Sequence, residues 1–187
     1  MANEAANVVV GANGSVFVAD LEATAPDDVG TPLGSEWTEM GFISEDGATF
    51  TEGKDVTDIN AWQSFYPIRR IITGRTVTVA FALREWSTAT VEFALGGTVS
   101  DNGGEFTYTP PSPEDLSEKQ LVLDWQDGEK NYRLWIPRGI VSESVETNLT
   151  RTGAADLAVT FAATDPGTED SIYTLFTDDP AFEPVGS

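Results

Sequence analysis

The sequence predicts a mainly β protein, a β-sandwich or barrel with one short α-helix at its flank. Three observations support this fold class: short apolar runs with period-two alternation, Asp-Gly pairs between such runs, and no long stretch of helical periodicity. With 187 residues, 40% of them apolar, the chain is long enough for a domain with a substantial core. We therefore expect a single domain over residues 1–187.

The chain begins with an expected arm, strand and loop. Residues 1–14 have no hydrophobic pattern and predict an N-terminal arm, and 15–21 alternate as a strand does. Residues 22–35 contain two prolines, two glycines and three acidic residues. They predict a long acidic loop, and unstructured loops of this length usually have a function.

Asp46-Gly47 lies between two short β-rich runs, 37–44 and 48–51. Because Asp-Gly is a strong hairpin signal, we expect these runs to form a hairpin that turns at Gly47. Another short β-rich run follows at 68–72, with Pro67 at its start.

Residues 76–85 predict a strand with two unlike faces, because successive side chains of a strand point to opposite sides. The bulky apolar face consists of Val77, Val79, Phe81 and Leu83, and the small polar face of Thr76, Thr78, Ala80, Ala82 and Arg84. The bulky face requires a packed layer.

A short helix is expected directly after this strand. Ser87 can cap it, and the glycine pair at 96–97 can end it. Trp86 is placed to pack against Val91 as a hydrophobic staple, and with Leu95 these residues would extend the bulky face. Several β-branched residues favour a strand here, which is the alternative.

The C-terminal half continues the β pattern. Two runs, 120–125 and 131–136, are joined at Asp127-Gly128 and predict a second hairpin. Further strands are expected at 139–148, 156–163 and 171–176. Residues 177–187 are acidic and broken by proline, and predict a C-terminal arm.

Composition excludes several classes of function. Ten basic and 31 acidic residues give a net charge of −21, which repels phosphate and disfavours conventional DNA binding. The absence of cysteine and histidine removes disulfides, ordinary zinc sites and the Ser-His-Asp triad. No apolar run is long enough for a membrane span. We expect no enzyme activity and no cofactor, and solvated loops rather than calcium sites at 27–28 and 165–170.

The positive charge is concentrated in one segment. Residues 60–84 contain four arginines and no acidic residue. We expect Arg69, Arg70 and Arg75 to compensate acidic groups within the fold or on neighbouring copies, and Arg84 to pair with an acidic residue.

The block GFISEDGATFTEGKDVTDINAWQSFYPIRRIITGRTVTVAFALREWSTATVEFALGG, residues 41–97, resembles the major tail tube proteins of long-tailed bacteriophages. The resemblance lies in the order of its features: EDG, the acidic DVTDI before AWQ, the arginine-bearing strand, and FALREW before a short helix ending in GG. WIPRGIVSESVE and LAVTFAATD extend it more weakly towards the C-terminus.

The resemblance implies the tail-tube fold, in which ring oligomerisation completes an inner β-barrel. It implies hexameric rings stacked into a hollow tube around a tape-measure protein, with a tail terminator and baseplate or tip proteins as further partners. DNA would pass through the lumen without sequence-specific binding. The protein would be made and assembled in the host cytoplasm and reside in the virion tail.

The same resemblance assigns expected roles to residues. The small face, Thr76, Thr78, Ala80, Ala82 and Arg84, would line the lumen, where acidic groups would repel DNA. The loop residues Asp27, Asp28 and Pro32, together with both termini, would form inter-ring contacts. Arg69, Arg70 and Arg75 would lie at subunit interfaces.

Other functions are compatible with the sequence. A related tube or terminator subunit of a contractile tail or secretion apparatus would share this architecture. A carbohydrate-binding β-sandwich would use exposed tryptophans as a platform, and a hydrolase would use two of the many carboxylates.

Overall fold

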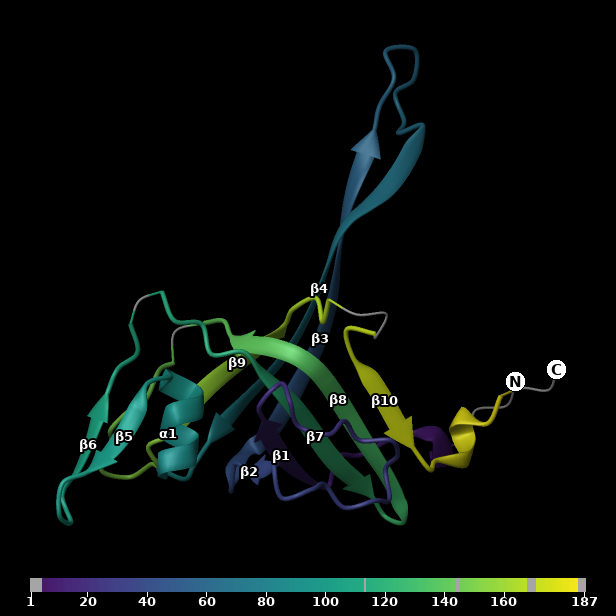
Figure 1. Cartoon of the computed structure of the whole chain (residues 1–187). Helices are drawn as coiled ribbons and strands as arrows, with labels where there is room; N and C mark the ends of the chain where they lie inside the picture. The colour runs from purple at the N-terminus through teal and green to yellow at the C-terminus, as the bar shows by residue number, and fades with distance from the viewer. Residues whose placement is uncertain (1–4, 113, 144, 168–170, 185–187) are drawn as a thin grey trace.

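A computed structural model gives the fold and describes residues 5–112, 114–143, 145–167 and 171–184 (Figure 1). These residues form ten strands, one α-helix and two 3-10 helices: η1 Ala5–Asn7, β1 Asn13–Ala19, β2 Thr38–Glu39, β3 Ile43–Ile59, β4 Arg69–Leu83, α1 Thr88–Leu95, β5 Thr98–Asp101, β6 Phe106–Thr109, β7 Lys119–Asp127, β8 Lys130–Val141, β9 Leu157–Ala163, β10 Thr174–Thr177 and η2 Pro180–Phe182.

The main sheet is antiparallel, with strand order β2-β1-β7-β8-β9-β4-β3 and with β10 also paired to β8. Strand β8 exchanges partners along its length: Tyr132–Trp135 pairs with β10, and Gly139–Val141 pairs with β9. Glycine is required at position 139 for this close approach of the strands, because it has no Cβ. A Cβ there would lie 2.5 Å from both the Ala162 carbonyl oxygen and the Phe161 ring and would clash with them. The sheet is thereby divided into a first leaf, β2-β1-β7-β8, and a second leaf, β9-β4-β3.

The core lies between the two leaves. Alternate side chains from both leaves join one buried cluster: Val16, Val18, Leu121, Leu123, Leu134 and Ile136 from the first, and Val77, Val79, Phe81, Leu83, Leu157, Val159 and Phe161 from the second. This arrangement is a β-sandwich. The predicted mainly β fold with one short helix is confirmed.

Helix α1 closes one side of the core. The Ser87 hydroxyl accepts a hydrogen bond from the Thr90 N–H, and the Thr90 hydroxyl accepts one from the Ser87 N–H, so the two residues form a capping box. Gly96, with φ of 69°, follows the last turn. Thr90 and Ala94 are buried, and the Phe93 ring lies 6.3 Å from that of Phe81.

Two residues expected on the packing face lie elsewhere. Trp86 is 52% exposed, and its Nε1–H donates to the Ala155 carbonyl at 2.6 Å, so it does not staple the helix to Val91. Leu95 is also exposed, because the helix turns the side containing Thr90 and Ala94 towards the core. Val91 is half-buried against the core, as Phe93 is.

The hairpin predicted at Asp46-Gly47 is wrong. Strand β3 runs through this pair, with a large bulge: Ile43 pairs with Leu83 and Ala48 with Phe81, so residues 44–47 lie opposite one residue of β4. Gly47 does adopt a positive φ of 71°, but in the bulge. Asp-Gly thus correctly indicated a positive φ at Gly47, but the residue lies in a bulge rather than in a turn.

The true hairpin is much longer. Beyond the body, β3 and β4 continue as a two-stranded ribbon that projects from the sandwich and turns within 60–68 (Figure 1). We call residues 54–75 the arm. The sequence predicts two separate short strands here, at 55–62 and 68–72, rather than one continuous ribbon.

The remaining elements follow local signals. Strands β7 and β8 form the hairpin predicted at Asp127-Gly128, with Asp127 paired to Lys130. Strands β5 and β6 form a separate two-stranded sheet next to α1 (Figure 1). Within the described ranges, no helix is long and apolar enough to span a membrane.

Candidate assembly surfaces

The outer side of the second leaf is made of small uncharged residues. Backbone pairing places Thr51 of β3 beside Thr78 of β4, and Thr78 beside Ala162 of β9. It likewise places Thr49 beside Ala80, and Ala80 beside Thr160. We call this surface the neutral face: Thr49, Thr51, Gly53, Thr76, Thr78, Ala80, Ala82, Ala158, Thr160 and Ala162. It contains four of the five residues predicted to line a lumen, and their side chains point away from the core.

The neutral face has no acidic residue among these ten positions, so the expected acidic lining is not present there. Glu143 contacts this face, since its carboxylate accepts a hydrogen bond from the Thr160 hydroxyl at 3.0 Å. The next position on this side of β3 is Asp55, which pairs with Gly74 at the base of the arm, so acidic residues begin at the edge of the neutral face.

Arg84, the fifth predicted lumen residue, lies just beyond the end of β4. Its Nε is 3.4 Å from Asp156 Oδ1, and its backbone N–H donates to the Phe42 carbonyl at 2.8 Å. The acidic partner expected for Arg84 is therefore found in its own subunit.

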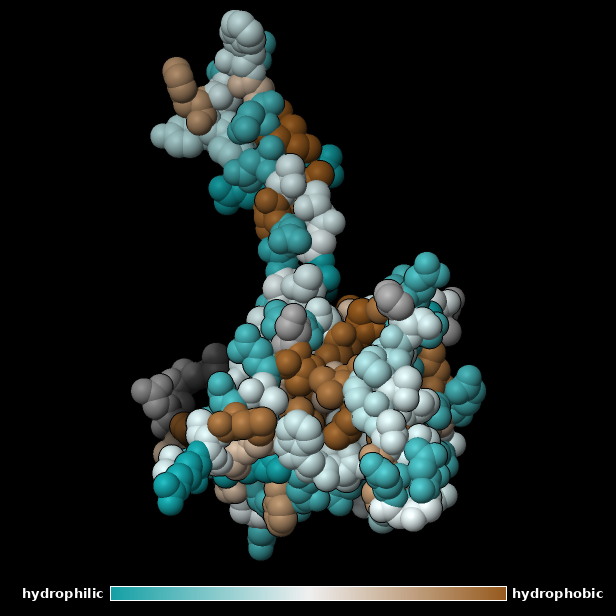
Figure 2. All heavy atoms as spheres, turned by 90° about the vertical axis from the view of Figure 1, so that its left-hand side faces the viewer, coloured by the Kyte–Doolittle hydropathy of each residue, from teal (hydrophilic) through white to brown (hydrophobic). Residues whose placement is uncertain are grey.

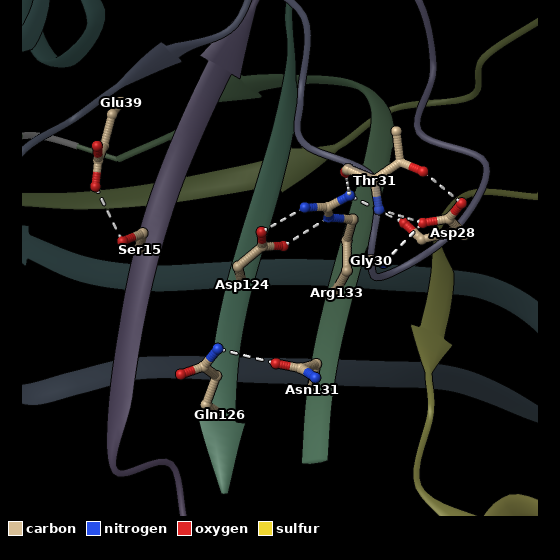
Figure 3. Close-up of polar contacts among 9 residues, drawn as sticks. All are labelled: Ser15, Asp28, Gly30, Thr31, Glu39, Asp124, Gln126, Asn131 and Arg133. Carbon is tan, nitrogen blue, oxygen red and sulfur yellow. Dashed lines mark hydrogen bonds and ion pairs between the residues drawn. The ribbon is translucent and has the colours of Figure 1, made fainter. Parts of the chain in front are cut away.

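The acidic loop is attached to the outer side of the first leaf (Figure 3). The Arg133 guanidinium contacts both Asp124 carboxylate oxygens, at 2.9 and 2.8 Å. Its Nη1 donates to the carbonyls of Asp28 and Thr31. Arg133 is 5% exposed, and the hydrogen bond to Asp124 raises its pKa.

Further contacts hold both ends of the loop. The Gln120 amide donates to the carbonyls of Asp20, Leu21 and Ala23, and Trp37 Nε1 donates to the Thr24 carbonyl. Trp37 also packs with Val122 in a second buried cluster. The loop is thus ordered on its own subunit.

The three predicted inter-ring residues differ in their surroundings. The Asp28 carboxylate accepts bonds from the Gly30 and Thr31 N–H groups and the Thr31 hydroxyl, and the Thr31 backbone bond lowers its pKa (Figure 3). Asp28 therefore builds a turn within the loop. Asp27, Asp28 and Pro32 are all exposed.

The C-terminal segment is attached to β8 by a buried carboxylate. Asp179 accepts hydrogen bonds from the Tyr132 hydroxyl at 2.6 Å, Lys130 Nζ at 3.0 Å and the Ala181 N–H at 2.9 Å. The bond from Tyr132 is the largest cause that lowers the pKa of Asp179 to about 2. Burial raises the pKa of Tyr132 to about 12. The predicted C-terminal arm is therefore fixed at Asp179; residues 185–187 lie outside the described part.

The tip of the arm exposes large apolar side chains. Trp62 and Phe65 are fully exposed, Tyr66 is 80% exposed and Ile68 is 62% exposed. Of the residues predicted for interfaces, Arg70 pairs with Asp58 at 2.9 Å, whereas Arg69 and Arg75 form no ion pair within the described ranges. All three arginines lie on the arm.

A groove of about 1290 Å³ lies between α1, the β5–β6 sheet and the first leaf. Figure 2, which views the molecule from the side of α1, shows apolar side chains in a hollow of the body below the arm. The groove lining includes Met40, Phe93, Leu95, Leu116 and Val141, together with seven acidic residues and one basic residue, Lys119.

Sequence reasoning missed both the aromatic tip and the groove. The tip had a usable signal, since residues 61–68 contain three aromatic residues and no acidic one. The groove has no such signal, because its walls come from distant parts of the chain.

Of the two segments considered for calcium, 27–28 is fully described and 165–170 only in part. Asp28 is engaged in its turn, and no group of three or more acidic residues suited to a metal ion occurs in the described ranges. Part of the second candidate, 168–170, lies outside those ranges.

Comparison with known proteins identifies the family. No curated protein matches this sequence. A family model described as "Phage tail tube protein" matches residues 1–186, nearly the whole chain. The mainly β sandwich with one flanking helix agrees with the fold expected for such a subunit. The chain belongs to the phage tail tube protein family.

Proposed function

We propose that this protein assembles into hexameric rings that stack into the hollow tail tube and that this tube conducts DNA to the host during ejection. The observation that best supports this function is the neutral face on a leaf with an open edge. Strand β3 pairs only with β4 among the described strands, so its other edge is available to a neighbouring subunit. Pairing between copies would extend the second leaf into a shared barrel and cover an edge prone to aggregation.

The neutral face suits a DNA conduit. It offers no lysine or arginine on which phosphate could pause, and no large side chain that would narrow the passage. DNA would slide along hydrated threonine and alanine, while the acidic residues elsewhere disfavour binding to the outer surface. Arg84 is compatible with this role because Asp156 pairs with it.

The family also supports the proposed partners: copies of the chain itself, a tape-measure protein in the lumen, and terminator and baseplate or tip proteins at the ends. Asp27, Asp28, Pro32 and the segments near both termini remain predicted inter-ring contacts. A contractile-tail or secretion-tube subunit would share these surfaces and is the alternative within the same class.

Negative-stain electron microscopy of the purified protein tests the assembly. Six-fold rings or tubes are expected, and a persistent monomer over a wide concentration range would contradict the proposal.

A labelling experiment tests which surface faces the lumen. Because the chain has no cysteine, Ala80→Cys provides a specific label for the neutral face. A small maleimide should label assembled tubes, whereas a maleimide on a large polymer should label only disassembled subunits. Thr107→Cys, exposed on β6, is the control.

A further inference from the structure

We propose that the arm tip of one copy docks in the groove beside α1 of another copy. This inference rests on the proposed self-assembly and names the two surfaces that meet. The tip consists of Trp62, Phe65, Tyr66, Ile68 and Arg69, and its partner is a second copy of this chain.

The tip has the properties of an interface anchor. Trp62 and Phe65 are fully exposed, so no other described residue covers their rings. Aromatic side chains bury about 150–250 Å² each, so three of them would cover roughly 450–750 Å². That area approaches the roughly 800 Å² that each partner contributes to a standard stable interface. Tryptophan, tyrosine and arginine are also the residues that dominate binding energy at interfaces.

The groove has the complementary shape. Its volume of about 1290 Å³ exceeds the roughly 300–1,000 Å³ of small-molecule pockets, as a groove for a polypeptide tip would. Apolar residues such as Met40, Phe93 and Val141 line it, and Leu116 is 73% exposed at its margin. Covering this margin would bury an apolar side chain that the monomer leaves in water.

The tip and the groove carry opposite charges, which favours contact between these two surfaces. Among the described residues that line the groove, seven are acidic and one, Lys119, is basic. Glu114 and Asp115 form no ion pair within the described ranges. Arg69 at the tip likewise forms none there. A basic tip and an acidic groove attract, whereas most other pairs of surfaces on this acidic chain repel.

The two surfaces cannot meet within one molecule. The arm points away from the body, and the groove lies low on the body beside α1 (Figure 1). Tip and groove are different surfaces, so their contact is heterologous: every copy offers one of each, and the contact can propagate from copy to copy. Assembly with a direction follows from this geometry.

Charge reversal tests the pairing. Arg69→Glu and Glu114→Lys should each raise the protein concentration needed for assembly at least tenfold, and the double variant should recover most of the loss. Arg151→Glu and Glu105→Lys are matched controls, since both residues are exposed and lie outside the tip and the groove. Assembly that is unaffected by both single reversals, or a double variant worse than either, would overturn the proposal.

Disulfide crosslinking detects contact between the tip and the groove even where no tube forms. Gln63→Cys at the tip and Ser117→Cys in the groove are placed on separate chains that otherwise lack cysteine. Mixing should give disulfide-linked pairs at least tenfold more abundantly than mixing Gln63→Cys with exposed Thr152→Cys. Tubes without a Gln63–Ser117 link would refute the docking and leave the proposed function intact. If the wild type forms no tubes, the proposed function fails, and the link is still scored in any oligomer.

Discussion

Arg133 and Asp179 show how single residues order the segments that leave the sheet. Both side chains are buried, and both lie at β8 or pack against it. Arg133 joins a carboxylate on β7 to two loop carbonyls, and Asp179 joins a tyrosine and a lysine on β8 to the first turn of η2. The acidic loop and the C-terminal segment are therefore held in a fixed conformation on their own subunit.

Replacing Arg133 should release the acidic loop. Arg133→Met removes all four guanidinium bonds and leaves Asp124 unpaired, so we expect the free energy of unfolding to fall by about 3 kcal/mol. Arg133→Lys should recover only part of this, because an ammonium cannot make the bidentate contact. Urea unfolding measures the loss, and hydrogen exchange over residues 20–37 locates it. Equal stability of Arg133→Met and the surface control Arg151→Met would contradict this role.

The Asp179 anchor should depend on pH in a defined window. Its folded pKa of about 2 lies below the ordinary value of 3.8, so its contribution is complete above about 3.8 and is lost as pH falls through about 2. Tyr132 has the opposite sign: its raised pKa means that the contribution is lost as pH rises from 10 towards about 12. Hydrogen exchange of residues 178–183 should thus show protection at neutral pH that fades at both extremes.

Asp179→Asn separates this anchor from general acid unfolding. The variant should exchange residues 178–183 about tenfold faster at neutral pH, and the acid dependence of that segment should disappear. Asp165→Asn removes the same charge from an exposed loop and should change neither. An unchanged acid limb in Asp179→Asn would show that another group controls the segment.

At the scale of elements, the arm is an appendage of the body. Its side chains are mostly exposed, and the buried positions of β4 begin at Val77. Since Gly53 pairs with Thr76, an Asn-Gly turn joining these two residues can replace residues 54–75. We expect this shortened protein to fold with thermal stability close to that of the full chain and to form no tubes. Circular dichroism and electron microscopy test both parts, and a molten body would contradict the structural independence of the arm.

The sequence predicted elements well where one local pattern determined the structure. The alternation at 76–83 separated the buried Val77, Val79, Phe81 and Leu83 from the neutral face, and Ser87 and Gly96 marked the helix ends. Prediction from the sequence failed where the structure of a segment depends on its pairing with another strand. Gly47 needs a positive φ in a turn and in a bulge alike, and only the register against β4 distinguishes them. Trp86 was placed by helical spacing, but the Ala155 carbonyl holds it outside the core.

At the scale of the whole molecule, charge is sorted by surface. The body carries most of the acidic residues, the arm carries three of the chain's arginines, and the neutral face carries no charge. Composition alone gave the total of −21, and it led to an expected acidic lumen. It could not locate the neutral face, because three strands contribute to it and their pairing brings Thr49, Ala80 and Thr160 together.

This distribution predicts what a single cation would do to the tube. Ala80→Lys places one ammonium per subunit on the neutral face, so a stacked tube would present a repeated ring of positive charge to DNA. If the face lines the lumen, variant tubes should retain duplex DNA in co-sedimentation at 50 mM salt and lose most of it at 200 mM, whereas wild-type tubes retain none. Thr107→Lys adds the same charge at an exposed position on β6, outside the neutral face. Since DNA inside a tube is shielded from nuclease, only DNA held by Ala80→Lys should survive digestion. Equal retention and equal digestion in the two variants would place the neutral face outside the lumen.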